Sequence, residues 1–313
     1  VAMLLCMPAA RGLFQRAIAQ SGARLARGSG DPARTTRELL QALAIPEQRL
    51  EALWELPAER FVPAQQQVAA GNPGAGPFST VFSPVHDGDT LPLPLDQALA
   101  AGDCAKVPLL IGTNRDELNL FLGQALKKLN EPLADSVLIE RLSNVITGAS
   151  EARLRDLVEV YRRSRSARQL PHGERALLAA ISSDALWRVP SARFADAYRR
   201  HQPATFQYLF TYESPAMRGA LRSCHGLELG FMFGTLDSPG QAQFAGSGEA
   251  QQRLSERMMD SWLAFTRTGE PSVPGADQAW PPTTTSSARR WCSICRAASS
   301  TRPMKRNDRP GTT

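Results

Sequence analysis

The segment Val107–Gly112 (VPLLIG) most strongly limits what this chain can fold into. It is a short, continuous apolar run, which is typical of a strand buried on both faces of a parallel sheet. The polar residues TNRDE follow it directly. Thr205–Thr211 (TFQYLFT) alternates aromatic residues and predicts a second strand. Because these strands alternate with long helical segments, the sequence favours an α/β fold.

Three helical segments are the clearest. Ser150 predicts the cap of a helix that extends to Arg163. Glu174–Arg200 predicts two helical stretches separated by Pro190, because proline interrupts a helix. Glu249–Thr268 is amphipathic and is followed by glycine and proline, which stop helices.

The net charge of +6 is confined to the end of the chain. Residues 283–313 contain seven Lys or Arg and a single acid, so residues 1–282 are neutral. The basic balance therefore comes from this last segment and says nothing about the ligand of residues 1–282, so it gives no support to nucleic acid as a partner. No apolar run approaches the roughly 20 residues that cross a bilayer. The five cysteines have no regular spacing, and the C-x-x-C of Cys292 and Cys295 has no second pair at zinc spacing.

A carboxylate and a histidine stand where an α/β sheet places its chemistry. Glu117 follows the predicted strand 107–112, and His225 opens an apolar run in SCHGLELGFMFG. An acid followed by a histidine is the chain order of α/β-hydrolase triads, in which a G-x-S-x-G serine comes first. The sequence contains no G-x-S-x-G. The nearest string surrounds Ser150, which lies after the acid and is better explained as a helix cap.

Several spaced motifs resemble those of the type-B carboxylesterases, the family that includes the cholinesterases and the bacterial para-nitrobenzyl esterases. They occur in the family's order from residue 1 to about residue 282. The segments are GLFQRAIAQSGA (12–23), FSPVHDGDTLP (82–92), VPLLIGTNRDELNLF (107–121), CHGLELGFMFG (224–234), MMDSWLAFTRTGEPSVPG (258–275) and WPP (280–282). The resemblance implies an α/β-hydrolase fold and carboxylic ester hydrolysis by a Ser-His-Glu triad.

The family's catalytic glutamate corresponds to Glu117 and its catalytic histidine to His225. The resemblance also implies that the serine and the oxyanion motif precede Val1. We therefore expect this chain to be a C-terminal portion that lacks the N-terminal part of the sheet and the nucleophile elbow. Such a portion is expected to be inactive alone, and its compartment cannot be deduced because a signal peptide would lie upstream.

Secondary candidates surround this pair. Ser21 resembles a family serine that lies near the triad acid, although a plain turn serine is an equally good interpretation. Glu228 is predicted to be a buried acid near the histidine. Trp187, Phe231 and Phe233 are candidates for lining the substrate pocket, although aromatic residues at such spacing also form ordinary core.

No cofactor or metal is expected. The pair of acids in Asp87-Gly88-Asp89 fits a turn better than a cation site. The partner that the resemblance implies is a small carboxylic ester, and the oligomeric state is left open.

The last segment departs from the family. Residues 1–282 are predicted to form the carboxylesterase body, and residues 283–313 a disordered tail. Back-translation of Arg290–Cys295 in a shifted frame gives Met-Val-Phe-Asp-Leu, which is family-like. We therefore hypothesise that the tail is frameshifted. The competing interpretation of the whole chain is a non-catalytic, cholinesterase-like binding module on the same fold.

Overall fold

The computed structural model describes residues 1–23, 32–71, 81–128, 131–271, 280 and 282, with the side chains of 123–128 left out. The predicted tail 283–313, with Cys292 and Cys295, lies outside the described residues. The chain forms two compact units. The first comprises residues 1–15 and 22–107, and the second comprises 16–21 together with 108 onward.

The second unit is built on a three-stranded parallel sheet in the order β1-β2-β3. The strands are β1 (Ala17–Gln20), β2 (Leu109–Asn114) and β3 (Thr205–Phe210). In register, Ala17 lies opposite Leu109, and Leu109 lies opposite Thr205. All six residues of β2 are buried, so the strand predicted from the apolar run is confirmed as the centre of the sheet.

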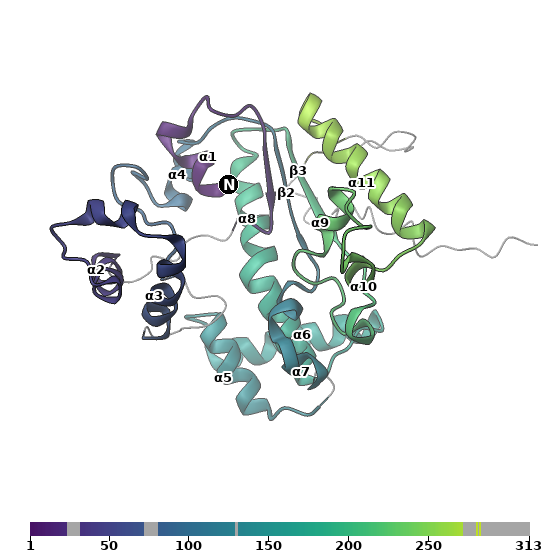
Figure 1. The fold of residues 1–313 in the computed structure, drawn as a ribbon. Coiled ribbons are helices and arrows are strands. Elements are labelled where there is room, and N and C mark those ends of the chain that lie inside the picture. Colours follow the sequence, from purple (N-terminus) through teal and green to yellow (C-terminus); the bar gives the residue numbers. More distant parts are fainter. Residues whose placement is uncertain (24–31, 72–80, 129–130, 272–279, 281, 283–313) are drawn as a thin grey trace, which may run out of the picture. The chain divides into compact units, whose positions relative to one another are not determined.

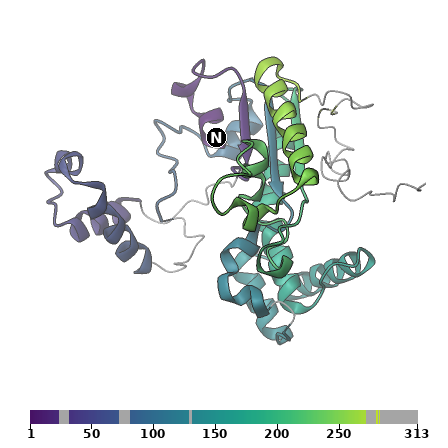
Figure 2. The ribbon, with the colours of Figure 1, turned by 45° about the vertical axis from the view of Figure 1, so that its right-hand side comes forward.

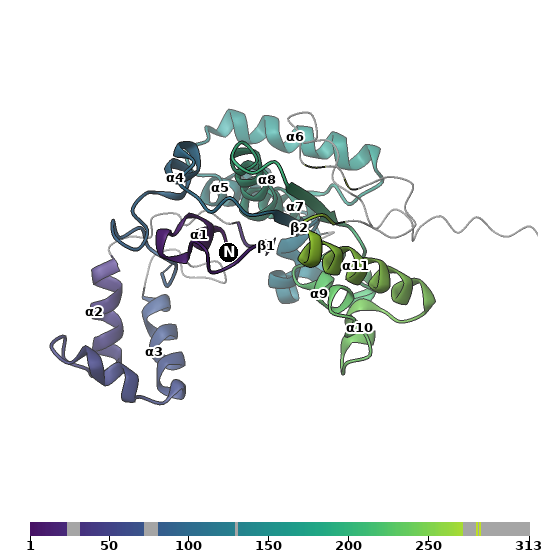
Figure 3. The ribbon, with the colours of Figure 1, turned by 90° about the horizontal axis from the view of Figure 1, so that it is seen from above.

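Helices cover both faces of this sheet (Figures 1 and 3). Helix α8 (Val189–Tyr198) packs on β2 and β3. On the other face lie α9 (Leu227–Met232) and α11 (Glu249–Thr268), and Figure 2 shows α11 running alongside the strands. Ring contacts join the two layers, because Tyr208 meets Trp262 at 5.1 Å and Phe206 meets Phe265 at 6.3 Å. The helix predicted for 249–268 is confirmed, and Gly269 ends it with a φ of +87°.

A close approach inside the sheet explains one glycine. A Cβ built on Gly112 would lie 2.3 Å from the ring of Tyr208 on the neighbouring strand. No side chain fits at that distance, so glycine at this position allows the aromatic residues of β3 to pack across β2.

A helical cluster adjoins the sheet within the same unit. It consists of α5 (Asp135–Val145), α6 (Glu151–Ala167) and α7 (Glu174–Ser183), with a buried core of leucine, isoleucine and valine. The predicted cap is confirmed, because the Ser150 Oγ accepts the Arg153 N–H at 3.4 Å. The prediction of a break at Pro190 is wrong. Pro190 stands in the first turn of α8, and the backbone before it stays helical because a π-helical turn joins α7 to α8.

The second unit also contains further helical elements. They are the 3₁₀ helix η3 (Glu117–Lys128), the π turn η4 (Asp184–Arg188), η5 (Ala216–Gly219) and α10 (Gln241–Ala245).

The first unit is helical in its described part. Its elements are α1 (Ala2–Cys6), η1 (Pro8–Ala10), α2 (Pro32–Leu43), η2 (Leu50–Glu55), α3 (Ala58–Ala70) and α4 (Leu95–Ala101). Helix α2 packs against α3, and α1 packs against α4. No helix in the described residues is long and apolar enough to cross a membrane.

Candidate active site

The carboxyl end of β2 presents Glu117 as a fully buried carboxylate. Three donors meet it. The backbone N–H of Asn114 donates to Oε1 at 2.7 Å, and the Ser21 hydroxyl donates to the same oxygen at 2.5 Å. The Nδ1 of His225 lies 2.6 Å from Oε2. Glu117, His225 and Ser21, which are distant in the sequence, therefore meet at one point.

The hydrogen bond to Glu117 also sets the chemistry of the His225 ring. A carboxylate accepts, so Nδ1 carries the proton and Nε2 of the neutral ring has a free lone pair. The hydrogen bond to Glu117 raises the pKa of His225 above its ordinary 6.5, against a lowering by burial and with further help from the charges of Glu117 and Glu228. The His225 side chain is 35% exposed whereas Glu117 is buried, so the ring can reach a reactant while its orienting acid stays dry.

Local backbone geometry places these residues. Ser21 has a φ of +51° at the end of β1, and its N–H donates to the Gly112 carbonyl at 2.8 Å, continuing the sheet ladder. Gly226 has a φ of +73° directly after His225 and caps helix α9. A non-glycine residue in the left-handed region is unusual and is found most often where surrounding contacts hold it, as they do for Ser21.

Two aromatic rings flank the histidine. The Phe121 ring lies 5.3 Å from His225 and the Trp187 ring 5.9 Å, and the two rings stack on each other at 5.9 Å with an interplanar angle of 10°. The π-helical turn that replaces the predicted break at Pro190 carries Trp187. Single-turn π segments often occur at functional sites. Phe121 was not predicted as a site residue, although its position four residues after Glu117 is a signal in the sequence.

The other predicted pocket residues lie elsewhere. The Phe231 side chain is fully buried in the core, with its ring 5.6 Å from Phe210 and 4.8 Å from Tyr212. Phe233 is 67% exposed. Of the three aromatic candidates, the structure places Trp187 in ring contact with His225.

Glu228 lies behind the histidine as a second buried acid. It is 2% exposed, and the amide groups of Asn114 and Gln20 donate to it. Burial raises the pKa of Glu228 above 4.5, while the Asn114 hydrogen bond opposes that shift. Asn114 also donates to the Cys224 carbonyl at 2.6 Å, so one amide links Glu228 to the chain just before His225.

Cys224 is the nearest thiol in sequence to the histidine, but it is not suited to be a nucleophile. It is fully buried, and burial raises the pKa of its thiol to about 12. The reactive form of cysteine is the thiolate, so this group stays inert at neutral pH.

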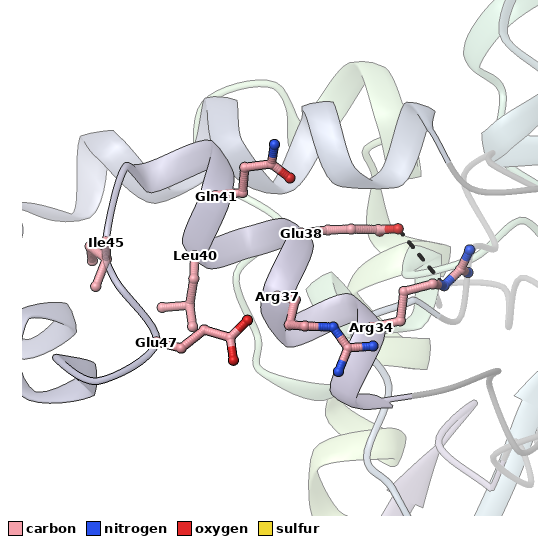
Figure 4. A pocket seen from close by; sticks show the side chains of 7 residues that line it. All are labelled: Arg34, Arg37, Glu38, Leu40, Gln41, Ile45 and Glu47. Carbon is pink, nitrogen blue, oxygen red and sulfur yellow. Dashed lines mark ion pairs between the residues drawn. The ribbon is translucent and has the colours of Figure 1, made fainter.

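A separate hollow of about 440 Å³ lies on the first unit and is lined by Arg34, Arg37, Glu38, Leu40, Gln41, Ile45 and Glu47 (Figure 4). Its two arginines are balanced by two glutamates, and Arg34 pairs with Glu38 at 3.8 Å. Its described lining contains no serine, histidine or cysteine, so it lacks the groups for nucleophilic chemistry.

The Asp87-Gly88-Asp89 segment forms a turn. The Asp87 carboxylate accepts the N–H groups of Asp89 at 3.1 Å and Leu91 at 2.9 Å. Within the residues described, no group of three or more His, Cys, Asp or Glu side chains is placed to hold a metal ion.

A parallel sheet covered by helices, with an acid and a histidine joined at its carboxyl edge, is the arrangement of the α/β-hydrolase class. Comparison with known proteins confirms this class, because solved carboxylesterases of that fold resemble the structure. The chain belongs to the carboxylesterase family, whose sequence profile matches residues 1–310.

Individual relatives support the assignment. Para-nitrobenzyl esterase of Bacillus subtilis (strain 168) is 30% identical over 281 residues, which cover 90% of this chain and 53% of that protein. A carboxylesterase structure from Geobacillus stearothermophilus has a TM-score of 0.66 at 28% identity, over 91% of this chain and 56% of that one. Mouse neuroligin-3 is 25% identical over 288 residues, covering 88% and 34% respectively. The chain spans about half the length of the esterases that it matches.

Proposed function

We propose that Glu117 and His225 are the acid and the general base of a Ser-His-Glu triad that hydrolyses small carboxylic esters. The observation that carries the proposal is the 2.6 Å contact between the Nδ1 of His225 and the buried carboxylate of Glu117. A histidine with a purely structural role does not require a buried carboxylate at Nδ1 while the rest of its ring is accessible to solvent. That combination is what a general base requires.

The chemistry follows from this orientation. His225 Nε2 removes the proton of a serine hydroxyl as the serine oxygen bonds to the ester carbonyl carbon. The imidazolium, stabilised by Glu117, then gives that proton to the departing alcohol as the ester C–O bond breaks. Water repeats both steps, releasing the carboxylic acid and restoring the serine.

The proposal places the nucleophilic serine outside residues 1–313. The sequence contains no G-x-S-x-G, and the serines nearest to qualifying have other roles. Ser150 caps α6, and the Ser21 hydroxyl donates to Glu117. In the same proposal, residues 1–282 are the carboxylesterase body and the chain is inactive by itself.

Ser21 and Glu228 support the pair rather than react. The Ser21 hydroxyl donates a hydrogen bond to Glu117 and stabilises its negative charge. Glu228 accepts a hydrogen bond from the Asn114 amide, and the same amide donates to the Cys224 carbonyl just before His225. Phe121 and Trp187 form an apolar wall beside the base, which suits the hydrocarbon part of an ester. Phe231 and Phe233, buried in the core and exposed respectively, contribute less to this wall.

A second candidate is a non-catalytic binding module, because the same fold can carry unrelated functions. The paired Glu117 and His225 favour the hydrolase, because binding alone does not require an oriented base. The two candidates differ in what precedes Val1, since only a hydrolase needs a serine there.

The experiment has two arms. Sequencing the gene upstream of the Val1 codon is expected to find an in-frame G-x-S-x-G, and a replaced serine would favour the binding module. Treating the 313-residue chain with a fluorophosphonate, followed by peptide mass spectrometry, is expected to label no serine. Stoichiometric labelling of any serine within this chain would refute the placement of the nucleophile.

A further inference from the structure

Four charged side chains connect the loop of the acid to the loop of the histidine. We propose that Arg115, Asp116, Glu213 and Arg222, here called the charged clamp, position His225 on Glu117. The inference rests on the proposed function, because it assigns these residues a role in orienting the general base. They are positioning residues and make no contact with the reacting atoms.

The clamp is a continuous chain of ion pairs. The Arg115 Nε lies 2.8 Å from Asp116 Oδ2, and its Nη2 lies 2.5 Å from Glu213 Oε1. Arg222 Nη2 lies 3.0 Å from the same Glu213 oxygen. The side chains of Asp116, Arg222 and Arg115 are only 5%, 19% and 24% exposed. Because partly buried pairs are screened less than surface pairs, this network resists displacement more than exposed ion pairs do.

Backbone hydrogen bonds connect the clamp to both reactive residues. The Asp116 N–H donates to the Ser223 carbonyl at 2.8 Å, and the Ser223 N–H donates back to the Asp116 carboxylate at 3.3 Å. Asp116 immediately precedes Glu117, and Ser223 lies two residues before His225. The two hydrogen bonds therefore tie the residue before Glu117 to the segment just before His225.

Arg222 also holds an unfavourable backbone conformation. Its φ is +51°, in the left-handed region that non-glycine residues rarely occupy. Its carbonyl accepts the Ser214 N–H at 3.0 Å, while its guanidinium is held by Glu213 next in sequence to Ser214. Strained residues persist where their surroundings over-determine them, and here the surroundings direct the chain toward His225.

The test uses nuclear magnetic resonance on the 313-residue chain with ¹⁵N-labelled histidine. The His225 signals are assigned by their loss in His225→Gln, and the readouts are the Nδ1 proton resonance and the imidazole pKa. Asp116→Ala is expected to weaken or abolish the Nδ1 proton resonance and to lower the pKa of His225 toward 6.5. Asp116→Asn keeps an acceptor for the Ser223 N–H but loses the ion pair with Arg115, so both readouts are expected to lie between those of Asp116→Ala and the wild type.

Two further variants keep the outcome decisive. Glu151→Gln removes an exposed ion pair with Arg155 and should leave both readouts unchanged. If Asp116→Ala does not fold, Glu213→Gln should shift the readouts in the same direction by a smaller amount, because Glu213 joins the two arginines but is the most exposed member of the clamp, at 44%. Wild-type values in every folded clamp variant would overturn the inference. If instead Glu117→Gln leaves the pKa of His225 unchanged, the proposed catalytic pair itself fails.

An independent observation in the first unit carries a second inference, about Cys6 and Cys104. The Ala105 N–H donates to the Leu5 carbonyl at 2.7 Å. Arg11, further along the first segment, pairs with Asp103, further back on the second. The two contacts, together with the effect of Cys104 on the pKa of Cys6, show that the end of α1 lies against the segment that contains Cys104.

The hydrogen bond joins the residue before Cys6 to the residue after Cys104, so the two cysteines stand next to a direct backbone contact. A disulfide requires Cα atoms within about 7 Å, which such neighbours can reach. Both side chains are free thiols, 3% and 5% exposed. Helix α1 ends with Cys6 and helix α4 ends shortly before Cys104, and the two helices pack side by side (Figures 1 and 3). We infer that Cys6 and Cys104 form a disulfide when the chain meets a small disulfide oxidant such as oxidised glutathione.

The exchange balances in two steps. One cysteine thiolate attacks a sulfur of the oxidant, forming a mixed disulfide and releasing one small thiol. The other cysteine then attacks the mixed disulfide, forming the Cys6–Cys104 bond and releasing the second small thiol. Burial, with help from Cys104, raises the pKa of Cys6 to about 12, so the exchange should be slow at neutral pH and faster in mild alkali.

The test incubates the chain with oxidised glutathione at alkaline pH, alkylates it, and maps peptides without reduction. A cross-linked peptide joining Cys6 to Cys104 is expected, with a raised melting temperature that dithiothreitol reverses. Cys104→Ala should abolish both effects, whereas Cys224→Ala, which removes another buried thiol, should retain them. Recovery of Cys6 and Cys104 as alkylated thiols, or joined to other cysteines, would refute the inference.

Discussion

Two buried acids of the second unit, Glu117 and Asp184, are similar in burial but different in use. Asp184 opens the π-helical turn and is 7% exposed, and both the Arg188 guanidinium and the Tyr161 hydroxyl donate to it. Glu117 is fully buried and holds His225. Arginine stays charged at any physiological pH, so its pair with Asp184 can only hold structure. Histidine can gain and lose its proton near neutral pH, so its pair with Glu117 can take part in chemistry.

The charges around each acid show the same contrast. Burial raises the pKa of Asp184, and the charge of Arg188 opposes that shift. At the other site, the Glu117 hydrogen bond raises the pKa of His225 above 6.5. Glu117 thus shifts the pKa of a partner, His225, that titrates near neutral pH. At Asp184, by contrast, the Arg188 cation compensates the charge of the buried carboxylate. Four substitutions or titrations test this distinction.

The largest effect is expected from Glu117→Gln. The amide no longer supplies a charge for the imidazolium, and it can present an N–H to Nδ1, which favours the wrong tautomer. The pKa of His225 should return to its ordinary value or fall below it, as measured by an NMR titration. In any form of the protein that carries the serine, kcat should fall by about 10⁴, as expected for loss of a triad acid. An unchanged pKa would contradict the assignment of Glu117.

Asp184→Asn is the matched substitution at the structural acid. It removes the charge that Arg188 and Tyr161 share, so the free energy of unfolding should fall by about 1–3 kcal/mol, measured by chemical denaturation. The pKa of His225 should stay at the wild-type value. A His225 shift as large as that of Glu117→Gln would show that the two acids act as one system.

Ser21→Ala should have a smaller effect. It removes one hydroxyl donor to Glu117 while the Asn114 N–H remains. The expected loss of unfolding free energy is about 1 kcal/mol, with a slight change in the pKa of His225. No change in either quantity would mean that Ser21 is a plain turn residue.

The smallest effect is expected in the pH dependence of stability. Because the folded pKa of His225 lies above the unfolded value, its contribution is fully present below about pH 6.5 and is lost as the pH rises through the folded pKa. The difference in unfolding free energy between the wild type and His225→Gln should therefore narrow across that window. Asp184→Asn should run parallel to the wild type there, because Arg188 does not titrate.

Local sequence was sufficient for some elements. The apolar run 107–112 predicted the central strand because a strand buried on both faces leaves no alternation in the sequence. Ser150 predicted a helix start because its hydroxyl can satisfy a backbone N–H, and it does so. The break expected at Pro190 does not occur, because a π-helical turn carries the helical backbone from α7 into α8.

The candidate site divides in the same way. The family motifs identified Glu117 and His225, and they singled out Ser21, Glu228 and Trp187 for possible roles. The motifs did not predict that Phe121 packs beside His225 or that Phe231 lies in the core. An aromatic residue has the same local signal whether it packs in a core or beside a base, and only the path of the chain distinguishes the two.

The sequence by itself determined that this chain belongs to an α/β class, and it supplied the carboxylate of Glu117 and the imidazole of His225, because strand burial and residue chemistry are encoded locally. Tertiary structure alone decided that Glu117 and His225, which are 108 residues apart in the chain, form a 2.6 Å hydrogen bond. It also decided that one buried acid pairs with a histidine and the other, Asp184, with an arginine. Parallel strands bring their carboxyl ends to one edge, and the partner that each acid finds there depends on the packing of every element around it.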